Sequence, residues 1–296
     1  MDGASLHALG AAAAVGSAAT WAVTSLLVRR LMPPYTAVGV GAIRSCAGGG
    51  LLAGTLLLLY GPRPFLEIPP ASLGLLVVSI VAAICVGDTA FFESTRRLGL
   101  ARGMSISTTY PLVAAVLAAA FLDEPLTPRV ALGAVLTLGG VLLVIARRPE
   151  PGAALEDGWG LGIGAAAIAS AAWGVSAVAL KPALADVDIV TAQAVRLPIA
   201  GAFLFATPWA RGTVRRLRTE RTGARTLAVL SLLTASSSVM FVAGLKYGSV
   251  AVGTVLSSTA PMFAIPLGIV FLRERLSAAP VLGCAVAVAG IAVLQA

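Results

Sequence analysis

Residues 101–140 of the chain, ARGMSISTTYPLVAAVLAAAFLDEPLTPRVALGAVLTLGG, return near its end as residues 251–290, AVGTVLSSTAPMFAIPLGIVFLRERLSAAPVLGCAVAVAG, at a constant offset of 150. Identical residues coincide in the pairs Gly103/Gly253, Ser107/Ser257, Thr109/Thr259, Pro111/Pro261, Phe121/Phe271, Glu124/Glu274, Gly133/Gly283 and Gly140/Gly290. Upstream, the same Trp-to-Arg spacing of 23 residues recurs at an offset of 152, in Trp21 and Arg44 and again in Trp173 and Arg196. The chain is therefore two copies of one unit, which we place at 1–150 and 151–296.

Composition places both copies in a membrane. Of the 296 residues, 58% are apolar and only 11% are charged, whereas about a quarter are charged in soluble proteins. A mean hydropathy of +0.95 means more apolar surface than a globule of this size can hide, so a lipid bilayer must cover it. The 21 Lys and Arg outnumber the 13 Asp and Glu. Because almost all of these basic residues lie between apolar runs, they indicate anionic lipid headgroups as partners and not nucleic acid.

Ten apolar runs are long enough to cross a bilayer as helices, which takes about 20 residues each. They are 7–29, 35–60, 73–97, 103–122, 129–146, 159–181, 189–208, 225–246, 251–272 and 279–295. Since five runs per copy is an odd number, the second copy enters the membrane from the opposite side. Such inverted repeats are a device of secondary transporters. We expect an all-α, multi-pass protein of ten transmembrane helices in two inverted five-helix repeats, in the plasma membrane of a prokaryote.

Both copies end in the pattern A-x-G…P…F-L-x-E-x-L…G…G, and both carry the tryptophan in their first apolar run and the arginine in their second. In these features, nearly the full chain resembles the EamA-type members of the drug/metabolite transporter (DMT) superfamily. The resemblance implies a helix bundle around a central cavity, lined mainly by helices 1, 3, 4, 6, 8 and 9. It also implies export or uptake of amino acids or other small metabolites.

Polar residues inside the apolar runs are the candidates for a substrate site. Pro111 and Pro261 each remove a backbone N–H in mid-helix, so both helices should bend there. Hydroxyl-rich clusters precede both prolines, and we take Ser107, Thr108, Tyr110, Ser257 and Ser258 as substrate-lining candidates. Trp21 and Trp173 are candidates for apolar walls. The alternative is that the hydroxyls only bond between helices and the aromatic rings only pack.

Charges deep in apolar runs are hypotheses of function by default, because they are costly in a bilayer. Arg44 and Asp88 lie at matched depth on consecutive helices, so they are predicted to pair near the midplane. The second copy keeps the arginine as Arg196 but has Ser238 where the first has Asp88. Asp88 could therefore bind the substrate or take up and release a proton during transport. A static ion pair that locks two helices together is the alternative.

The protein is predicted to be a secondary carrier of a small polar metabolite such as an amino acid. It is expected to use no cofactor and no metal. An intramembrane enzyme or a channel is the alternative. The sequence contains no H-E-x-x-H, G-x-S-x-G or P-loop pattern, which enzymes and ATP-driven pumps of those classes require. Cys46, Cys85 and Cys284 stand apart from one another and from His7, so neither a disulfide nor a zinc site is indicated.

Two further features predict helix packing and orientation. The repeated glycines near 133–140 and 283–290 favour close helix contact, and Glu124 and Glu274 are predicted to cap the helices that follow them. Of the 21 Lys and Arg, 15 fall in the loops opposite the termini. The positive-inside rule then puts both termini outside, whereas the resemblance implies termini in the cytoplasm.

Overall fold

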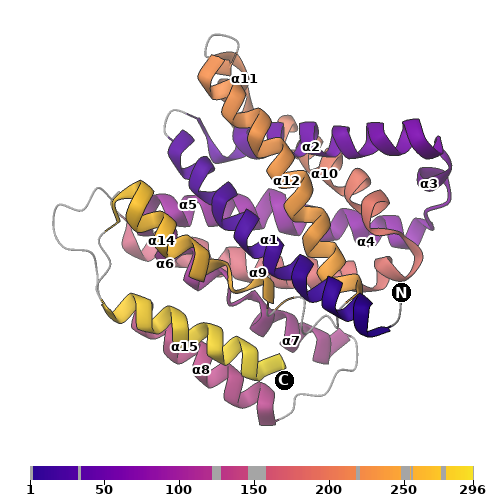
Figure 1. The fold of residues 1–296 in the computed structure, drawn as a ribbon. Helices are drawn as coiled ribbons and strands as arrows, with labels where there is room; N and C mark the ends of the chain where they lie inside the picture. The colour runs from indigo at the N-terminus through magenta and orange to yellow at the C-terminus, as the bar shows by residue number, and fades with distance from the viewer. Residues whose placement is uncertain are drawn as a thin grey trace.

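The computed structural model describes residues 3–32, 35–121, 128–145, 158–217, 221–247, 254, 256–274 and 278–295. Within these ranges the regular structure is helical and no strand occurs, as Figure 1 shows. The all-α class predicted from the sequence is therefore confirmed.

The helices follow one another in the order of the two sequence copies. The first copy contains α1 Gly3–Leu31, α2 Ala37–Tyr60, α3 Arg63–Leu66, α4 Pro70–Ile80, the π-helix η1 Val81–Asp88, α5 Thr89–Leu98, α6 Leu100–Ser107, α7 Tyr110–Phe121 and α8 Pro128–Ile145. The second contains α9 Trp159–Asp186, α10 Ile189–Ala206, α11 Trp209–Leu217, α12 Arg221–Tyr247, α14 Ala260–Leu272 and α15 Ala278–Gln295.

Seven stretches of the described residues are long and apolar enough to cross a bilayer. They are Ala8–Leu31, Ala37–Tyr60, Pro70–Leu98, Leu100–Phe121, Trp159–Asp186, Ile189–Ala206 and Gly223–Tyr247. The predicted count of ten is thus not confirmed. One reason is that α14 has only 13 residues, about 20 Å at 1.5 Å per residue, because the predicted run 251–272 is interrupted just before Ala260.

Helices of one copy pair with helices of the other. Figure 1 shows α8 and α15 side by side at one edge of the molecule, and α1 alongside α12. In the same way α2 packs on α10, and α9 packs on the continuous stretch of α4, η1 and α5. Gly41 of α2 faces Leu204 while Gly49 faces Leu197, so these counterpart helices run antiparallel. That direction is the one an inverted repeat requires.

The repeated glycines let the α8 and α15 backbones touch. A side chain on Gly140 would meet backbone atoms of Gly283 and Ala287, and one on Gly290 would meet the backbone of Thr137. Small residues at such contacts are typical of membrane helices, as the glycine repeat predicts. Large apolar side chains instead point outward, including Leu58 at 88% exposed, Phe121, Leu161 and Val270. This outer surface suits contact with lipid chains.

The two arginine-bearing helices begin in equivalent ways. Thr36 accepts a hydrogen bond from the N–H of Gly39 at the start of α2. Asp188, at the offset of 152, accepts from the N–H groups of Val190 and Thr191 at the start of α10. Such caps fix where a helix starts. Each arginine lies eight residues after its cap, so both are about 12 Å into the bundle.

Candidate functional site

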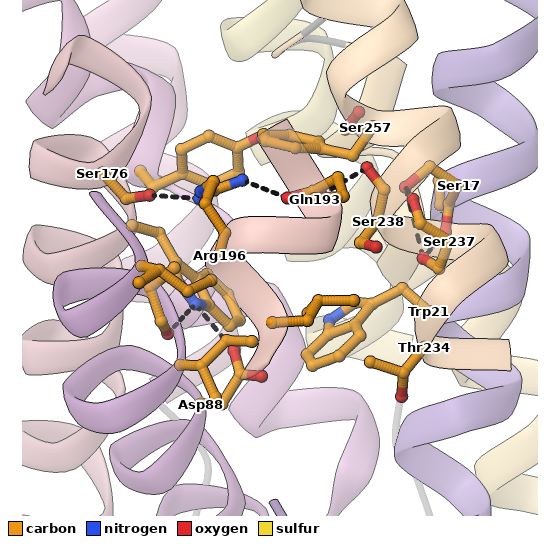
Figure 2. A pocket seen from close by; sticks show the side chains of 18 of the residues that line it. Ser17, Trp21, Asp88, Ser176, Gln193, Arg196, Thr234, Ser237, Ser238 and Ser257 are labelled. Carbon is orange, nitrogen blue, oxygen red and sulfur yellow. Dashed lines mark hydrogen bonds between the residues drawn. The ribbon is translucent and has the colours of Figure 1, made fainter. Parts of the chain in front are cut away.

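A central cavity of about 150 Å³ lies among helices of both copies (Figure 2). Its lining is mostly apolar or hydroxyl-bearing and contains three charged side chains, Arg44, Asp88 and Arg196. The full lining is Ser17, Ala18, Trp21, Arg44, Ile80, Ala83, Ile84, Asp88, Thr108, Tyr110, Trp173, Ser176, Gln193, Arg196, Leu197, Thr234, Ser237, Ser238, Phe241 and Ser257. The two arginines come from α2 and α10, which are helices 2 and 7 of the predicted bundle.

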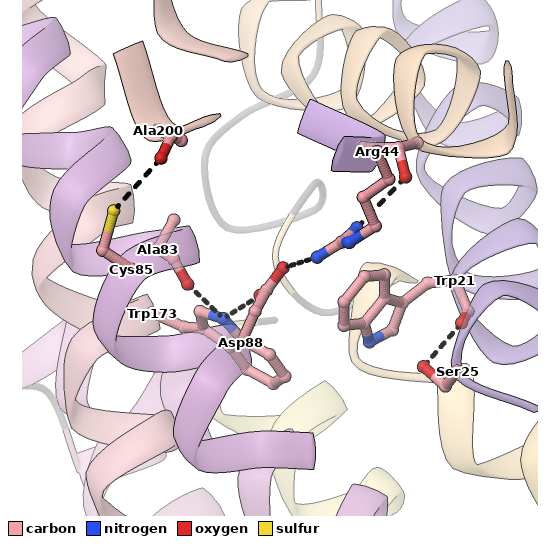
Figure 3. A network of polar contacts seen from close by, with 9 residues as sticks. Trp21, Ser25, Arg44, Ala83, Cys85, Asp88, Trp173 and Ala200 are labelled. Atoms are coloured by element: carbon pink, nitrogen blue, oxygen red, sulfur yellow. Dashed lines mark hydrogen bonds and ion pairs between the residues drawn. The ribbon is translucent and has the colours of Figure 1, made fainter. Parts of the chain in front are cut away.

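Arg44 and Asp88 form an ion pair at one side of this cavity, drawn in Figure 3. Nη2 of Arg44 donates to Oδ2 of Asp88, and Nη1 donates to Oγ1 of Thr234 on α12 at 3.1 Å. Only 1% of Arg44 is exposed, and Asp88 is buried. Because both charges are withdrawn from water, their mutual contact and hydrogen bonds must replace hydration.

The π-helix places Asp88 against Trp173. The indole Nε1–H of Trp173 is shared between Oδ1 of Asp88 at 3.1 Å and the carbonyl oxygen of Ala83 at 3.2 Å. Gly87 makes this approach possible, since a side chain there would collide with the Trp173 ring. With Arg44 on one carboxylate oxygen and Trp173 on the other, Asp88 links α2, η1 and α9. Short π-helical insertions of this kind are frequent at functional sites.

Aromatic rings form a continuous wall beside the ion pair. Trp21 lies 5.9 Å from Trp173 between ring centroids, and Phe91 lies 5.3 Å from Trp173. The Arg44 guanidinium stands 5.6 Å from the ring centroids of both Trp21 and Phe92. A cation held over ring faces gains electrostatic stabilisation when water is excluded. The wall therefore supports the buried arginine as well as bounding the cavity.

Arg196 has a different environment. It is 3% exposed, and its Nη1 donates to Oε1 of Gln193 at 2.8 Å while its Nη2 donates to Oγ of Ser79 at 2.9 Å and more weakly to Ser176. Gln193 in turn donates to the carbonyl oxygen of Ser238 at 2.8 Å. All of these acceptors are neutral, and among the described residues no carboxylate pairs with Arg196.

The hydroxyl clusters form equivalent turns in the two copies. The same two backbone hydrogen bonds recur, from Thr109 to Ile106 and Leu112 to Thr109, and from Thr259 to Leu256 and Met262 to Thr259. Thr108 and Ser258 each return their hydroxyl to the carbonyl four residues earlier. Both helices are thus interrupted one turn ahead of their proline, and Pro111 and Pro261 lie in the first turn of α7 and α14.

Comparison with known families decides what kind of protein has this arrangement. The model of the EamA-like transporter family matches residues 8–146 and again residues 160–295. The chain belongs to the EamA-like transporter family. Its two matches correspond to the two sequence copies, and the predicted membership in this family is confirmed.

Similar proteins agree with this membership. An uncharacterized transporter of Archaeoglobus fulgidus is 26% identical over 220 residues, 74% of each chain. An uncharacterized protein of Pseudomonas aeruginosa is 30% identical over 142 residues, which span about half of that protein, 47%, and 48% of this chain. A solved crystal structure superposes with a TM-score of 0.65 over 98% of this chain and 96% of the other, at 21% identity. At that identity the likeness shows the fold.

The cavity of this EamA-like protein contains most of the candidates chosen from sequence. Trp21, Asp88, Thr108, Tyr110, Trp173 and Ser257 line it. Ser107 and Ser258 lie outside the lining and are fully buried in the turns. Tyr110 lines the cavity with its ring, and its hydroxyl donates a hydrogen bond to the carbonyl oxygen of Thr254 at 3.3 Å. The substrate-binding role of these residues stays a prediction.

Sequence reasoning missed several polar lining residues, namely Ser17, Ser176, Gln193, Thr234 and Ser237. Helical spacing from residues already chosen would have found some of them, because positions three or four apart share one helix face. Gln193 precedes Arg196 by three, Ser176 follows Trp173 by three, and Ser17 precedes Trp21 by four.

Proposed function

We propose that this EamA-like transporter is a secondary carrier that takes a small polar metabolite, such as an amino acid, into the central cavity and releases it on the other side. The observation that carries the proposal is the cavity itself, which holds Arg44, Asp88 and Arg196 at the meeting point of the two copies. Intramembrane charges facing a cavity mark substrate or ion pathways.

The arrangement of the helices supports alternating access. Antiparallel counterpart helices can exchange two related shapes around a fixed site, so that the cavity opens to one side or the other. Each interrupted helix meets the cavity through its turn, where Thr108 and Ser257 stand in the lining. Irregular backbone at membrane depth is tolerated where it borders a cavity, so these turns favour a translocation site over simple packing.

Asp88 supports coupling to protons in this proposal. In the present arrangement Arg44 and Trp173 each donate a hydrogen bond to one of its two carboxylate oxygens. A change of shape that moves Arg44 away would leave the carboxylate without its countercharge, and proton uptake would then replace the lost pairing. Substrate movement and proton movement would thereby depend on one ion pair.

Uptake by reconstituted protein tests the carrier function. Purified protein in proteoliposomes is incubated with an extract of small bacterial metabolites uniformly labelled with ¹³C, and the lumen contents are measured by mass spectrometry against protein-free vesicles. We expect protein-dependent, saturable enrichment of a narrow group of compounds. Compounds converted outside without entering the lumen would indicate an enzyme, and non-saturable uptake would indicate a channel.

A further inference from the structure

We propose that Arg196 binds the carboxylate of a small substrate of net charge −1. This assignment rests on the proposed carrier function and replaces its example of an amino acid, which as a zwitterion carries no net charge, with a monoanionic carboxylate. The observations that carry it are the position of Arg196, its partners, its counterpart in the other copy, and the charge and size of the cavity.

Arg196 is placed where an uncompensated charge is costly. It is the eighth of the 18 residues of α10, so it stands about 10 Å from the start of a helix that crosses the bilayer. Arginine cannot be deprotonated at ordinary pH, and a charge at this depth needs either a partner or water. Its 3% exposure leaves little surface for water.

The partners of Arg196 leave its charge unbalanced. Gln193, Ser79 and Ser176 satisfy part of its five N–H donors with neutral oxygens, and its buried Nε has no hydrogen-bond partner among the described residues. Neutral acceptors orient a guanidinium without neutralising it. The planar fork of donors matches a carboxylate, which is the group that arginine recognises with two parallel hydrogen bonds.

The two copies provide an internal comparison. Arg44, the counterpart of Arg196, is neutralised by Asp88. The residue of the second copy that matches Asp88 is Ser238, which also lines the cavity and is joined to Arg196 through Gln193. The second copy therefore has the arginine without the carboxylate, and Figure 2 shows Arg196, Gln193 and Ser238 together at the cavity. A substrate carboxylate supplies the missing group.

Charge and volume limit the rest of the substrate. The three charged residues of the lining sum to +1, so a monoanion neutralises the cavity, whereas a zwitterion leaves it at +1. A cavity of about 150 Å³ is the size that accommodates benzene, a molecule of six carbon atoms. The rings of Trp21, Tyr110 and Trp173 also line the cavity. These features fit a monocarboxylate with a short, largely apolar remainder.

The ¹³C-extract uptake assay tests this assignment when the enriched compounds are sorted by charge. We expect small carboxylates of net charge −1. Arg196→Gln should lower their initial uptake rate at least about tenfold, and Arg196→Lys should restore part of it because the charge returns without the planar fork. Arg211→Gln removes an equal charge from an exposed site on α11, outside the cavity, and should keep the wild-type rate.

Ser238 gives a second test that does not remove the arginine. Ser238→Asp places a carboxylate where the first copy has one, so it should compete with the substrate for Arg196 and abolish uptake without lowering thermal stability. Ser238→Asn introduces a side chain of the same shape as aspartate but without its charge, so this variant should keep much more of the uptake rate.

Each outcome has a separate meaning. Enrichment of neutral, cationic or zwitterionic compounds in preference to monoanions, or wild-type uptake by Arg196→Gln, would overturn the assignment to Arg196 while the carrier function stands. An absence of any protein-dependent enrichment would overturn both.

Discussion

Among single residues, Asp88 is the group on which proton coupling depends. Asp88→Asn keeps the size of the side chain and removes its charge, so the substrate-dependent change in protonation disappears. We expect the variant still to exchange labelled for unlabelled substrate across proteoliposome membranes, but no longer to accumulate substrate against its gradient when a pH gradient is imposed.

A matched control is Asp186→Asn, at the end of α9, where Asp186 accepts a hydrogen bond from Ser72 away from the cavity. This variant should accumulate substrate as the wild type does. If Asp88→Asn still accumulates substrate in response to the pH gradient, then the contact between Asp88 and Arg44 has only a structural role.

Trp173 is expected to contribute to stability through its indole N–H. Trp173→Phe keeps an aromatic ring in the wall but removes the donor to Asp88 and Ala83. A hydrogen bond to a charged group contributes about 1.5–3 kcal/mol, so the variant should unfold in detergent at a distinctly lower temperature. Trp209→Phe, at an exposed position on α11, should leave the midpoint nearly unchanged, and equal midpoints for the two variants would contradict this role.

The contact between Arg44 and Asp88 could be foreseen from the sequence, and most of their surroundings could not. Matched depth on consecutive helices places two charges within reach of each other. Two of the acceptors of Arg196 are different, because Ser79 and Ser176 come from α4 and α9, whose rotation relative to α10 depends on packing throughout the bundle. A sequence fixes which residues share a helix face but not which faces meet.

Among the elements, the interrupted helices are the feature most open to test. Pro111→Ala restores a backbone N–H in the first turn of α7 and allows a continuous helix through Thr108 and Thr109. Uptake should fall several-fold while the amount of protein in the membrane stays the same. Pro128→Ala, at the first residue of α8, breaks no such turn and should transport normally. Equal uptake by both variants would show that the interruption does not shape the site.

The sequence predicted where the two proline-containing helices are interrupted, but it did not predict the π-helix. The proline pattern predicts bends where Pro111 and Pro261 crowd the carbonyls of Ser107 and Ser257, and the helices are interrupted at that level. The hydroxyls of Thr109 and Thr259 also bond there to carbonyls three residues back. The π-helix at 81–88 had no sequence signal, and within it the carbonyl oxygen of Ala83 accepts a hydrogen bond from Trp173 of the other copy.

Glu274 illustrates the same limit at a helix end. It was expected to cap the helix that follows it, but it accepts hydrogen bonds from the N–H groups of Leu100 and Ala101, at the start of α6 in the other copy. The prediction that Glu274 caps the start of a helix is confirmed, but the predicted helix is wrong, because long-range packing decides which helix start lies next to Glu274. Glu124 lies outside the described residues.

For the whole molecule, the distribution of charge predicts the orientation in the membrane. The short helix α11 carries Arg211, Arg215 and Arg216 on the side with most of the basic residues, which the positive-inside rule places in the cytoplasm. In a variant whose native cysteines are replaced, Arg211→Cys should react with a membrane-impermeant thiol reagent only after the cells are permeabilised. Labelling in intact cells would place this side outside, as the family resemblance implies.

Transport through two alternating shapes of the whole molecule is the central claim, and counterflow measures it most directly. Proteoliposomes preloaded with a high concentration of unlabelled substrate are diluted into a trace of labelled substrate, and the internal label is followed with time. A carrier exchanges one molecule for another through the central cavity, so the label should rise above its equilibrium level and then decline. A monotonic rise to equilibrium that ignores the internal substrate would contradict the claim.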